Sequence, residues 1–200
     1  IHGHLFQDVY EWAGEYRTVE MSKGPGRGFG EVKTGEVDRY LSDARQLVTS
    51  TDWAKISRND FVATASTVFA YVNQAHPFRE GNGRTSKVFM AHVAEQSPYR
   101  FDFARVSPEQ WNAGSAMSRP DMFAYAPEPA SLVPVFAAVT VERTAPPAAS
   151  DRAAQARSAL SASYPRPASE ATKQTPQQGT QARPPSAGYR ATRGPNVGRD

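Results

Sequence analysis

The large apolar residues of this chain are confined almost entirely to its first 142 positions. Residues 143–200 contain 8 of the 16 prolines and only a few large apolar or aromatic side chains: Leu160, Tyr164, Tyr189 and Val197. Such a segment cannot bury enough surface to offset the entropy that ordering it would cost. We therefore expect one folded domain over residues 1–142, followed by a disordered basic tail or linker rich in Pro, Ala and Arg. Because the chain starts at Ile1, inside an expected helix, we also expect the domain to be truncated at its N-terminus.

Charge divides at the same point. Residues 1–142 carry 14 Lys and Arg against 17 Asp and Glu, whereas residues 143–200 carry 9 against 3. The sequence pI near 9.3 therefore reflects the tail. A net acidic domain argues against nucleic-acid binding, except weakly through the tail. The absence of cysteine excludes disulfides and thiolate metal sites. No apolar run reaches the roughly 18–20 residues that a membrane span requires.

Helical spacing of apolar residues dominates the first 142 positions, so we expect a mostly α-helical fold. Ile1, Leu5 and Val9 fit one face of a helix, and Thr34 is a plausible N-cap for the next. Further helices are expected to start near Ser57, Arg84, Ser107 and Ser131. The helix after Ser57 is apolar or small on nearly every side, so it is predicted to be the central buried helix.

One segment between the first two helices has a different character. Tyr16 to Met21 alternates and contains β-forming residues, which predicts a short strand. Gly24 to Gly30 contains four glycines and predicts a loop. Together the two stretches predict a small β-hairpin that projects from the helices as a flap.

The residues from His76 to Arg84 predict a helix, a turn and a second helix. Pro77 disfavours helical geometry at His76 and so ends the first helix there. Glycines at positions 81 and 83 allow successive backbone N–H groups to point into one concave site. The N-terminus of the next helix adds unpaired donors and a positive dipole end, so this turn is suited to bind phosphate.

Four side chains around the turn suggest what the site does with a phosphate. Arg84 and Lys87 lie three residues apart and place two positive charges on one helix face. Glu80 offers one carboxylate, which together with phosphate oxygens commonly holds Mg²⁺. His76 can then serve as a general base beside the phosphate. Each residue alone has a commoner structural explanation, but the compact set points to phosphoryl or nucleotidyl transfer.

The string His76-Pro77-Phe78-Arg79-Glu80-Gly81-Asn82-Gly83-Arg84 resembles the signature of the Fic family, His-x-Phe-x-(Asp/Glu)-Gly-Asn-Gly-Arg-x-x-Arg. The resemblance extends to His4–Arg17, similar to the family's first helix and the approach to its flap, and to Met21–Gly24, similar to the flap itself. It covers about residues 1–140 and implies a Fic-type helical bundle with a small β-hairpin flap.

The resemblance also implies an activity: protein adenylylation, in which AMP passes from ATP to a Ser, Thr or Tyr hydroxyl of a target protein. His76 would be the general base, Glu80 would hold Mg²⁺, and Phe78 would anchor the loop. The family's phosphate-binding and nucleotide-binding positions map to Gly81, Asn82, Gly83, Arg84, Lys87, Lys23 and Gly24. Trp111 and Asn112 are weaker candidates for the wall around the base. A bacterial toxin or effector is implied, acting in the cytoplasm or after secretion into a host cell.

Two departures from the family pattern leave alternatives open. Lys87 stands where the signature ends in Arg, and lysine lacks the bidentate guanidinium fork. A different donor is therefore an alternative, transferring phosphate, UMP or phosphocholine. The family's inhibitory pattern, Ser/Thr-x-x-x-Glu-Gly/Asn, is not found in these 200 residues. Inhibition could lie in the missing N-terminus, come from a separate antitoxin-like partner, or be absent. A further alternative is an idle domain whose basic tail binds partners.

Overall fold

The longest helix of the structure, α3 (Arg58–Ala75), runs through the centre of the domain. The computed structural model describes residues 1–24, 28–143, 154–155 and 157–158. The hydroxyl of Ser57 accepts a hydrogen bond from the backbone N–H of Asp60 and caps this helix at its start. Its buried residues occur on several sides, from Phe61 to Ala75. The prediction of a central buried helix is therefore confirmed.

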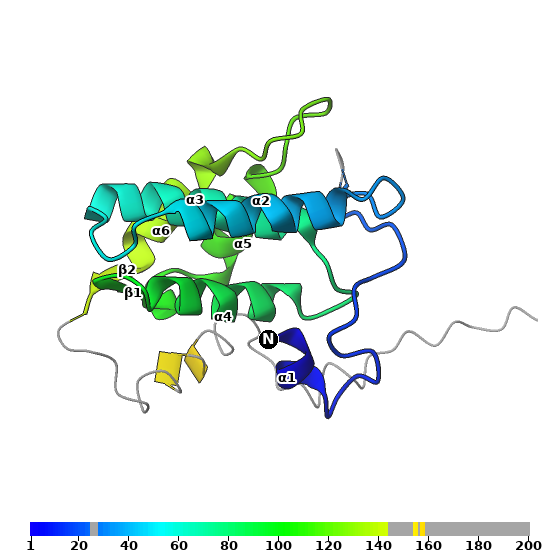
Figure 1. Cartoon of the computed structure of the whole chain (residues 1–200), viewed down its shortest axis with the longest axis horizontal. Coiled ribbons are helices and arrows are strands. Elements are labelled where there is room, and N and C mark those ends of the chain that lie inside the picture. The colour runs from blue at the N-terminus through cyan, green and yellow to red at the C-terminus, as the bar shows by residue number, and fades with distance from the viewer. Residues whose placement is uncertain (25–27, 144–153, 156, 159–200) are drawn as a thin grey trace, which may run out of the picture. The chain divides into compact units, whose positions relative to one another are not determined.

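Three other helices surround α3. Helix α2 (Glu36–Ser50) lies along one side of it, and α4 (Asn82–Ala94) and α6 (Val133–Val139) pack against it elsewhere. Figure 1 shows α2 and α3 running side by side, with α4 on the opposite side of the domain. Aromatic side chains fill the core between them, among them Phe61, Phe69, Phe101, Trp111 and Phe136. The mostly helical fold is thus as predicted.

The remaining elements are short. They are α1 (His2–Phe6), β1 (Tyr99–Phe101), a 3₁₀ turn (Phe103–Arg105), α5 (Pro108–Met117), a second 3₁₀ turn (Pro129–Ser131) and β2 (Thr140–Glu142). Strands β1 and β2 pair antiparallel, with Tyr99 opposite Glu142 and Phe101 opposite Thr140. Helix α5 begins with a complete capping box between Ser107 and Gln110, as its sequence predicts.

Two details of the first helices differ from expectation. Helix α2 is capped by Gly35, at φ 72°, and not by Thr34. In α1 the buried residues are His2 and Phe6, while Ile1 is 44% exposed and Val9 41% exposed. The apolar spacing from Ile1 to Val9 therefore pointed to the wrong face, because contacts with the loop after α3 decide which side of this short helix is buried.

The flap also differs from expectation. In its described residues, 16–24 and 28–30, there is no strand; one backbone hydrogen bond joins the two arms, from Phe29 N–H to the Met21 carbonyl at 3.1 Å. The guanidinium of Arg17 turns inward and donates to the Val19 carbonyl. That bond occupies a backbone acceptor that a partner strand would need. The flap is therefore an irregular loop held by side chains, and the two-stranded sheet lies elsewhere.

The predicted tail falls almost wholly outside the described residues. Its first residue, Arg143, belongs to the folded part: its backbone N–H donates to the Pro98 carbonyl at 2.8 Å and its Nε donates to the Tyr99 carbonyl at 2.9 Å. Among the helices that the structure describes, none has the length and apolar character needed to cross a membrane.

Candidate active site

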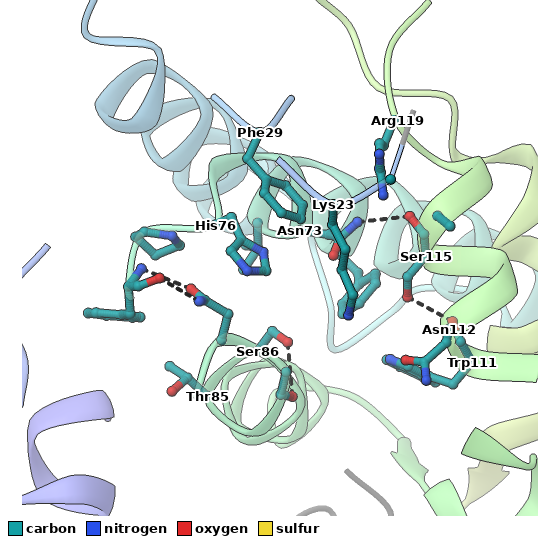
Figure 2. A pocket seen from close by; sticks show the side chains of 18 residues that line it. Lys23, Phe29, Asn73, His76, Thr85, Ser86, Trp111, Asn112, Ser115 and Arg119 are labelled. Atoms are coloured by element: carbon teal, nitrogen blue, oxygen red, sulfur yellow. Dashed lines mark hydrogen bonds between the residues drawn. The ribbon is translucent and has the colours of Figure 1, made fainter. Parts of the chain in front are cut away.

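A cavity of about 610 Å³ opens where the end of α3, the start of α4, α5 and the flap meet. Figure 2 shows His76 and Phe29 on one side of this cavity and Trp111 and Asn112 on the other. Seven of the site residues named from the sequence line it: Lys23, Gly24, His76, Phe78, Asn82, Gly83 and Asn112. Trp111 lines it as well and is at the same time a buried core residue.

His76 is the residue after the last turn of α3, and its backbone is left-handed, with φ 42° and ψ 57°. It is the one non-glycine residue with positive φ among the described residues. Such a conformation is costly for a residue with a Cβ and persists only where surrounding contacts enforce it. Here the ring of Phe29 stacks on the imidazole, with centroids 3.7 Å apart and planes at 10°.

The half-buried imidazole of His76 is held neutral. Burial, reinforced by the positive charges of Arg17 and Lys23, lowers the pKa of His76 from 6.5 to about 4. Its Nδ1 is buried and has no hydrogen-bond partner among the described residues. A neutral imidazole with an unused nitrogen in a cavity is able to accept a proton at neutral pH.

The loop after His76 is closed by the side chain of Asn82. Its Oδ1 accepts from the Phe78 N–H at 2.9 Å and its Nδ2 donates to the Phe78 carbonyl at 2.7 Å. The Asn82 amide is therefore fully engaged in shaping the turn. Its contribution to anion binding would come from the backbone N–H at the start of α4, where the first N–H groups have no partner within the helix.

The two glycines of the turn serve different purposes. Gly81 has φ 80°, and a Cβ on it would lie 2.5 Å from the ring of Phe6. Gly83 meets no atom within 4 Å of such a Cβ and faces the cavity. Gly81 therefore lets the loop pack against α1, whereas Gly83 leaves open space next to the N–H groups that open α4.

Glu80 and Arg84 lie beside the loop but outside the cavity lining. One oxygen of Glu80, Oε1, accepts from the Gly81 N–H at 2.9 Å and lies 4.0 Å from Arg84 Nη2. The Glu80 side chain is half exposed. The described residues hold no group of three or more His, Cys, Asp or Glu that could bind a metal by themselves. A single accessible carboxylate fits a Mg²⁺ ion that takes its other ligands from phosphate and water.

Lys87 lies away from the position predicted for it. It is 2% exposed and is not among the cavity-lining residues. Its Nζ lies 4.4 Å from the centroid of the Trp111 ring and 5.4 Å from that of Phe103. Burial lowers the pKa of Lys87 to about 8. In this structure the Lys87 side chain packs behind Trp111, because α4 presents residue 87 to α5.

Several cavity residues were not predicted from the sequence. Arg119 lines the cavity with its guanidinium 5.5 Å from the ring of Phe29, and nothing in its local sequence distinguishes it from a surface arginine. Thr85 has a buried Oγ1 with no partner among the described residues. Asn73 also lines the cavity, and its Nδ2 donates to the Ser115 carbonyl at 3.0 Å. Asn73 is one of several polar residues of α3, so its sequence did not single it out.

The fold and the glycine turn before α4 point to a class of protein. Residues 1–94 match the model of the Fic/DOC family, so this part of the chain is identified as a Fic-type domain. Among its relatives are y4lH of Sinorhizobium fredii, named a probable protein adenylyltransferase, at 36% identity over 114 residues, and the protein adenylyltransferase VbhT of Bartonella schoenbuchensis, at 34% over 119 residues. These matches cover 56% and 59% of this chain but only 57% and 24% of the relatives. The chain therefore corresponds to part of each relative.

Solved Fic domains share the fold. The N-terminal Fic domain of a VirB-translocated Bep effector protein from Bartonella quintana, with bound ADP, is 26% identical and has a TM-score of 0.63, covering 72% of this chain and 71% of that one. The Fic domain of Bep8 from Bartonella sp. 1-1C is also 26% identical, with a TM-score of 0.56 and coverage of 68% and 67%. The helical bundle of this chain is thus that of the Fic domains.

Proposed function

We propose that this chain transfers AMP from ATP to a Ser, Thr or Tyr hydroxyl of a target protein, with His76 as the general base. The observation that supports this most directly is the neutral imidazole of His76, whose Nδ1 has no partner among the described residues, in a cavity lined by the first turn of α4. The names of two relatives, both adenylyltransferases, and the ADP bound to the Bartonella quintana domain support the same reaction.

The chemistry follows from the positions of these groups. The target hydroxyl loses its proton to His76, and its oxygen forms a bond to the α-phosphorus of ATP. The bond from that phosphorus to the bridging oxygen of the β-phosphate breaks, and pyrophosphate leaves. Backbone N–H groups of Asn82 and Gly83 would hold the phosphate oxygens through the transition state, with the Thr85 hydroxyl as a further donor.

Glu80 would hold Mg²⁺ beside the phosphates. Bound there, the ion would neutralise charge on the phosphate oxygens as the pyrophosphate leaves. Arg84 lies on the same side of the loop, where its guanidinium is 4.0 Å from Glu80 and 4.4 Å from the ring of Phe6. Lys23 and Gly24 of the flap line the cavity opposite α4, so they are placed to contact the nucleotide or the incoming target segment.

A second donor is kept as an alternative because of Lys87. Its ammonium packs against Trp111, and lysine lacks the guanidinium fork with which the signature arginine would hold the γ-phosphate. A donor without a γ-phosphate, such as a diphosphate-linked phosphocholine, would not require a cation at that position. The separate antitoxin-like inhibitor stays part of the proposal, since the described residues offer no inhibitory helix of the family's pattern.

The test is incubation of the full chain with Mg²⁺, ATP labelled on the α-phosphate and a bacterial or host-cell lysate. His76→Ala should abolish labelling of protein, and His92→Ala is a matched control because this histidine is exposed on α4. Parallel reactions use ATP labelled on the γ-phosphate, labelled UTP and labelled CDP-choline. Label from one of those donors instead of the α-phosphate would replace the proposed donor, and equal labelling by the His76→Ala variant would refute the role of His76.

A reaction without transfer from any donor would favour the idle-domain alternative. On that view the tail binds an acidic partner or nucleic acid. Binding that weakens with salt and disappears when residues 144–200 are deleted would support it.

A further inference from the structure

Arg17 is a buried cation that neither the signature nor the cavity lining includes. It lies between α1 and the flap, and it is 3% exposed. The closest described carboxylate, Glu20, lies 3.8 Å away and is itself 45% exposed, so it compensates the charge only weakly. Burial accordingly lowers the pKa of Arg17. A buried charge is costly unless hydrogen bonds compensate it, so the groups that bond to Arg17 indicate its structural role.

The partners of Arg17 are backbone carbonyls at the end of α3. Its Nε donates to the His76 carbonyl at 2.8 Å, and its Nη2 donates to the Ala75 carbonyl at 3.4 Å. Its backbone N–H donates to the Pro77 carbonyl at 2.7 Å. The last carbonyls of a helix lack partners within it and carry the negative end of the dipole. Arg17 therefore caps α3 where the chain turns into the left-handed conformation of His76.

The same guanidinium also holds the flap. Its Nη2 donates to the Gly30 carbonyl and its Nη1 donates to the Val19 carbonyl. Gly30 is fixed from the other side as well, because its N–H donates to the Gln74 carbonyl at 2.8 Å. The residue before Gly30 is Phe29, whose ring covers the His76 imidazole. The Arg17 side chain thus links the backbone of His76 to the flap arm that carries the ring of Phe29.

We propose that Arg17 is the positioning residue of the catalytic histidine, fixing both the strained backbone of His76 and the flap arm that covers its ring. This inference rests on the proposed function of His76 as a base. Arg17 is not among the residues that line the cavity, so it would act by holding the imidazole where an incoming hydroxyl would lie. Displacing a catalytic group by about 1 Å can reduce a rate about 100-fold.

Charge provides an independent readout of this role. The groups that shift the pKa of His76 by charge are Arg17, Lys23 of the flap and Arg119 after α5, and all three are cations. Removing the charge of Arg17 while Lys23 and Arg119 remain should raise the pKa of His76 toward its usual value. A purely structural loss elsewhere in the domain would not do so.

The variants are Arg17→Met and Arg17→Lys, with Arg58→Met as the matched control. Arg58 also donates to carbonyls at a helix end, to Ala137 at 2.9 Å and Thr140 at 3.4 Å, but near α6 and away from the cavity lining. Three quantities are measured on the full chain: the pKa of His76 by NMR of its ring, the Kd for AMPPNP with Mg²⁺, and the rate of label transfer at saturating ATP.

We expect Arg17→Met to lower the saturated transfer rate by about 10- to 100-fold with less than about a threefold change in the Kd for AMPPNP. The pKa of His76 should rise by about one unit. Arg17→Lys keeps the positive charge but loses the bidentate guanidinium. It should therefore keep the pKa of His76 closer to the wild-type value than it keeps the transfer rate. Arg58→Met should lower stability and leave all three quantities unchanged.

The proposal is overturned if Arg17→Met leaves the rate and the pKa of His76 at wild-type values, or changes them no more than Arg58→Met does. If Arg17→Met does not fold, the same comparison is made with Arg17→Lys, whose unchanged rate would overturn the proposal. Absence of transfer by the wild-type chain from every donor would refute the proposed function instead, and the NMR measurement would still decide whether Arg17 controls His76.

Discussion

At the scale of single residues, the turn between His76 and α4 contains two glycines that are not equivalent. Gly81 combines φ 80° with a Cβ position 2.5 Å from Phe6, so any side chain there meets both backbone strain and a ring. Gly83 has neither constraint. The same residue type therefore fulfils a packing requirement at one position and leaves room for a ligand at the other.

We expect Gly81→Ala to lower the free energy of unfolding by about 2–4 kcal/mol, since the added methyl group displaces Phe6 from the loop. Gly83→Ala should change it by less than about 1 kcal/mol, because alanine fits the first turn of a helix. Urea denaturation of the two variants makes the comparison. Equal losses of stability would show that the contact between Phe6 and the loop is not what requires glycine at position 81.

His76 gives the stability of the domain a pH dependence whose sign is fixed by its lowered pKa. Unfolded, it takes up a proton near pH 6.5, whereas folded it does so only near pH 4. Between these values the unfolded state holds more protons, so stability falls as the pH drops. We expect the wild-type chain to lose about 2 kcal/mol more than His76→Asn between pH 7 and pH 5. The measurement is urea denaturation of both chains at pH 7 and pH 5. An equal loss of stability in the two chains would contradict the lowered pKa of His76.

At the scale of elements, the contact between α4 and α5 explains the unusual last position of the signature. Helix α4 presents Lys87 to Trp111 of α5 and to Phe103 of the first 3₁₀ turn. An ammonium over aromatic rings recovers part of its lost hydration through cation–π attraction. The rest of the desolvation cost remains, as the lowered pKa of Lys87 indicates.

Replacing Lys87 by Met should therefore stabilise the domain at pH 7, by on the order of 1 kcal/mol. Folded Lys87 releases its proton near pH 8 and unfolded lysine near pH 10.5, so wild-type stability should rise relative to Lys87→Met between these values. Denaturation at pH 7 and pH 9.5 measures both effects. A large rise in the Kd for AMPPNP in Lys87→Met would instead show that Lys87 leaves Trp111 to bind phosphate.

At the scale of the whole molecule, the folded domain is closed by the pairing of β1 with β2 and by the two hydrogen bonds of Arg143. The apolar residues that form the core all precede that point. The pairing of β1 with β2 ends at Glu142, the residue at which composition predicts the domain boundary.

A chain ending at Arg143 should unfold at the same urea midpoint as the 200-residue chain, within about 0.5 kcal/mol. A chain ending at Val139 removes β2 and should lose about 2 kcal/mol or more, because β1 then has no partner. A lower midpoint for the chain that ends at Arg143 would show that residues beyond it contribute to the fold.

Local rules were sufficient to predict a large part of this protein. The caps at Ser57 and Ser107 and the end of α3 at His76 depend on neighbouring residues, so they could be read from the sequence. The turn before α4 was also expected, but α4 begins at Asn82 and not near Arg84, so the turn is two residues shorter than predicted. Local rules failed for the N-cap of α2, for the buried face of α1 and for the strand expected after Tyr16, because those features depend on contacts with distant segments.

The sequence by itself determined that His76, the glycine turn and the start of α4 would adjoin, since they follow one another along the chain. Only the tertiary structure decided what surrounds them. Arg17 donates to the carbonyl of His76, which is 59 residues later in the sequence, and Arg119, which follows α5, also lines the cavity. The burial of Lys87 was likewise set by the packing of α4 on α5. The physical reason is that periodicity and capping act within a few residues, whereas burial and charge depend on which segments meet when the core forms.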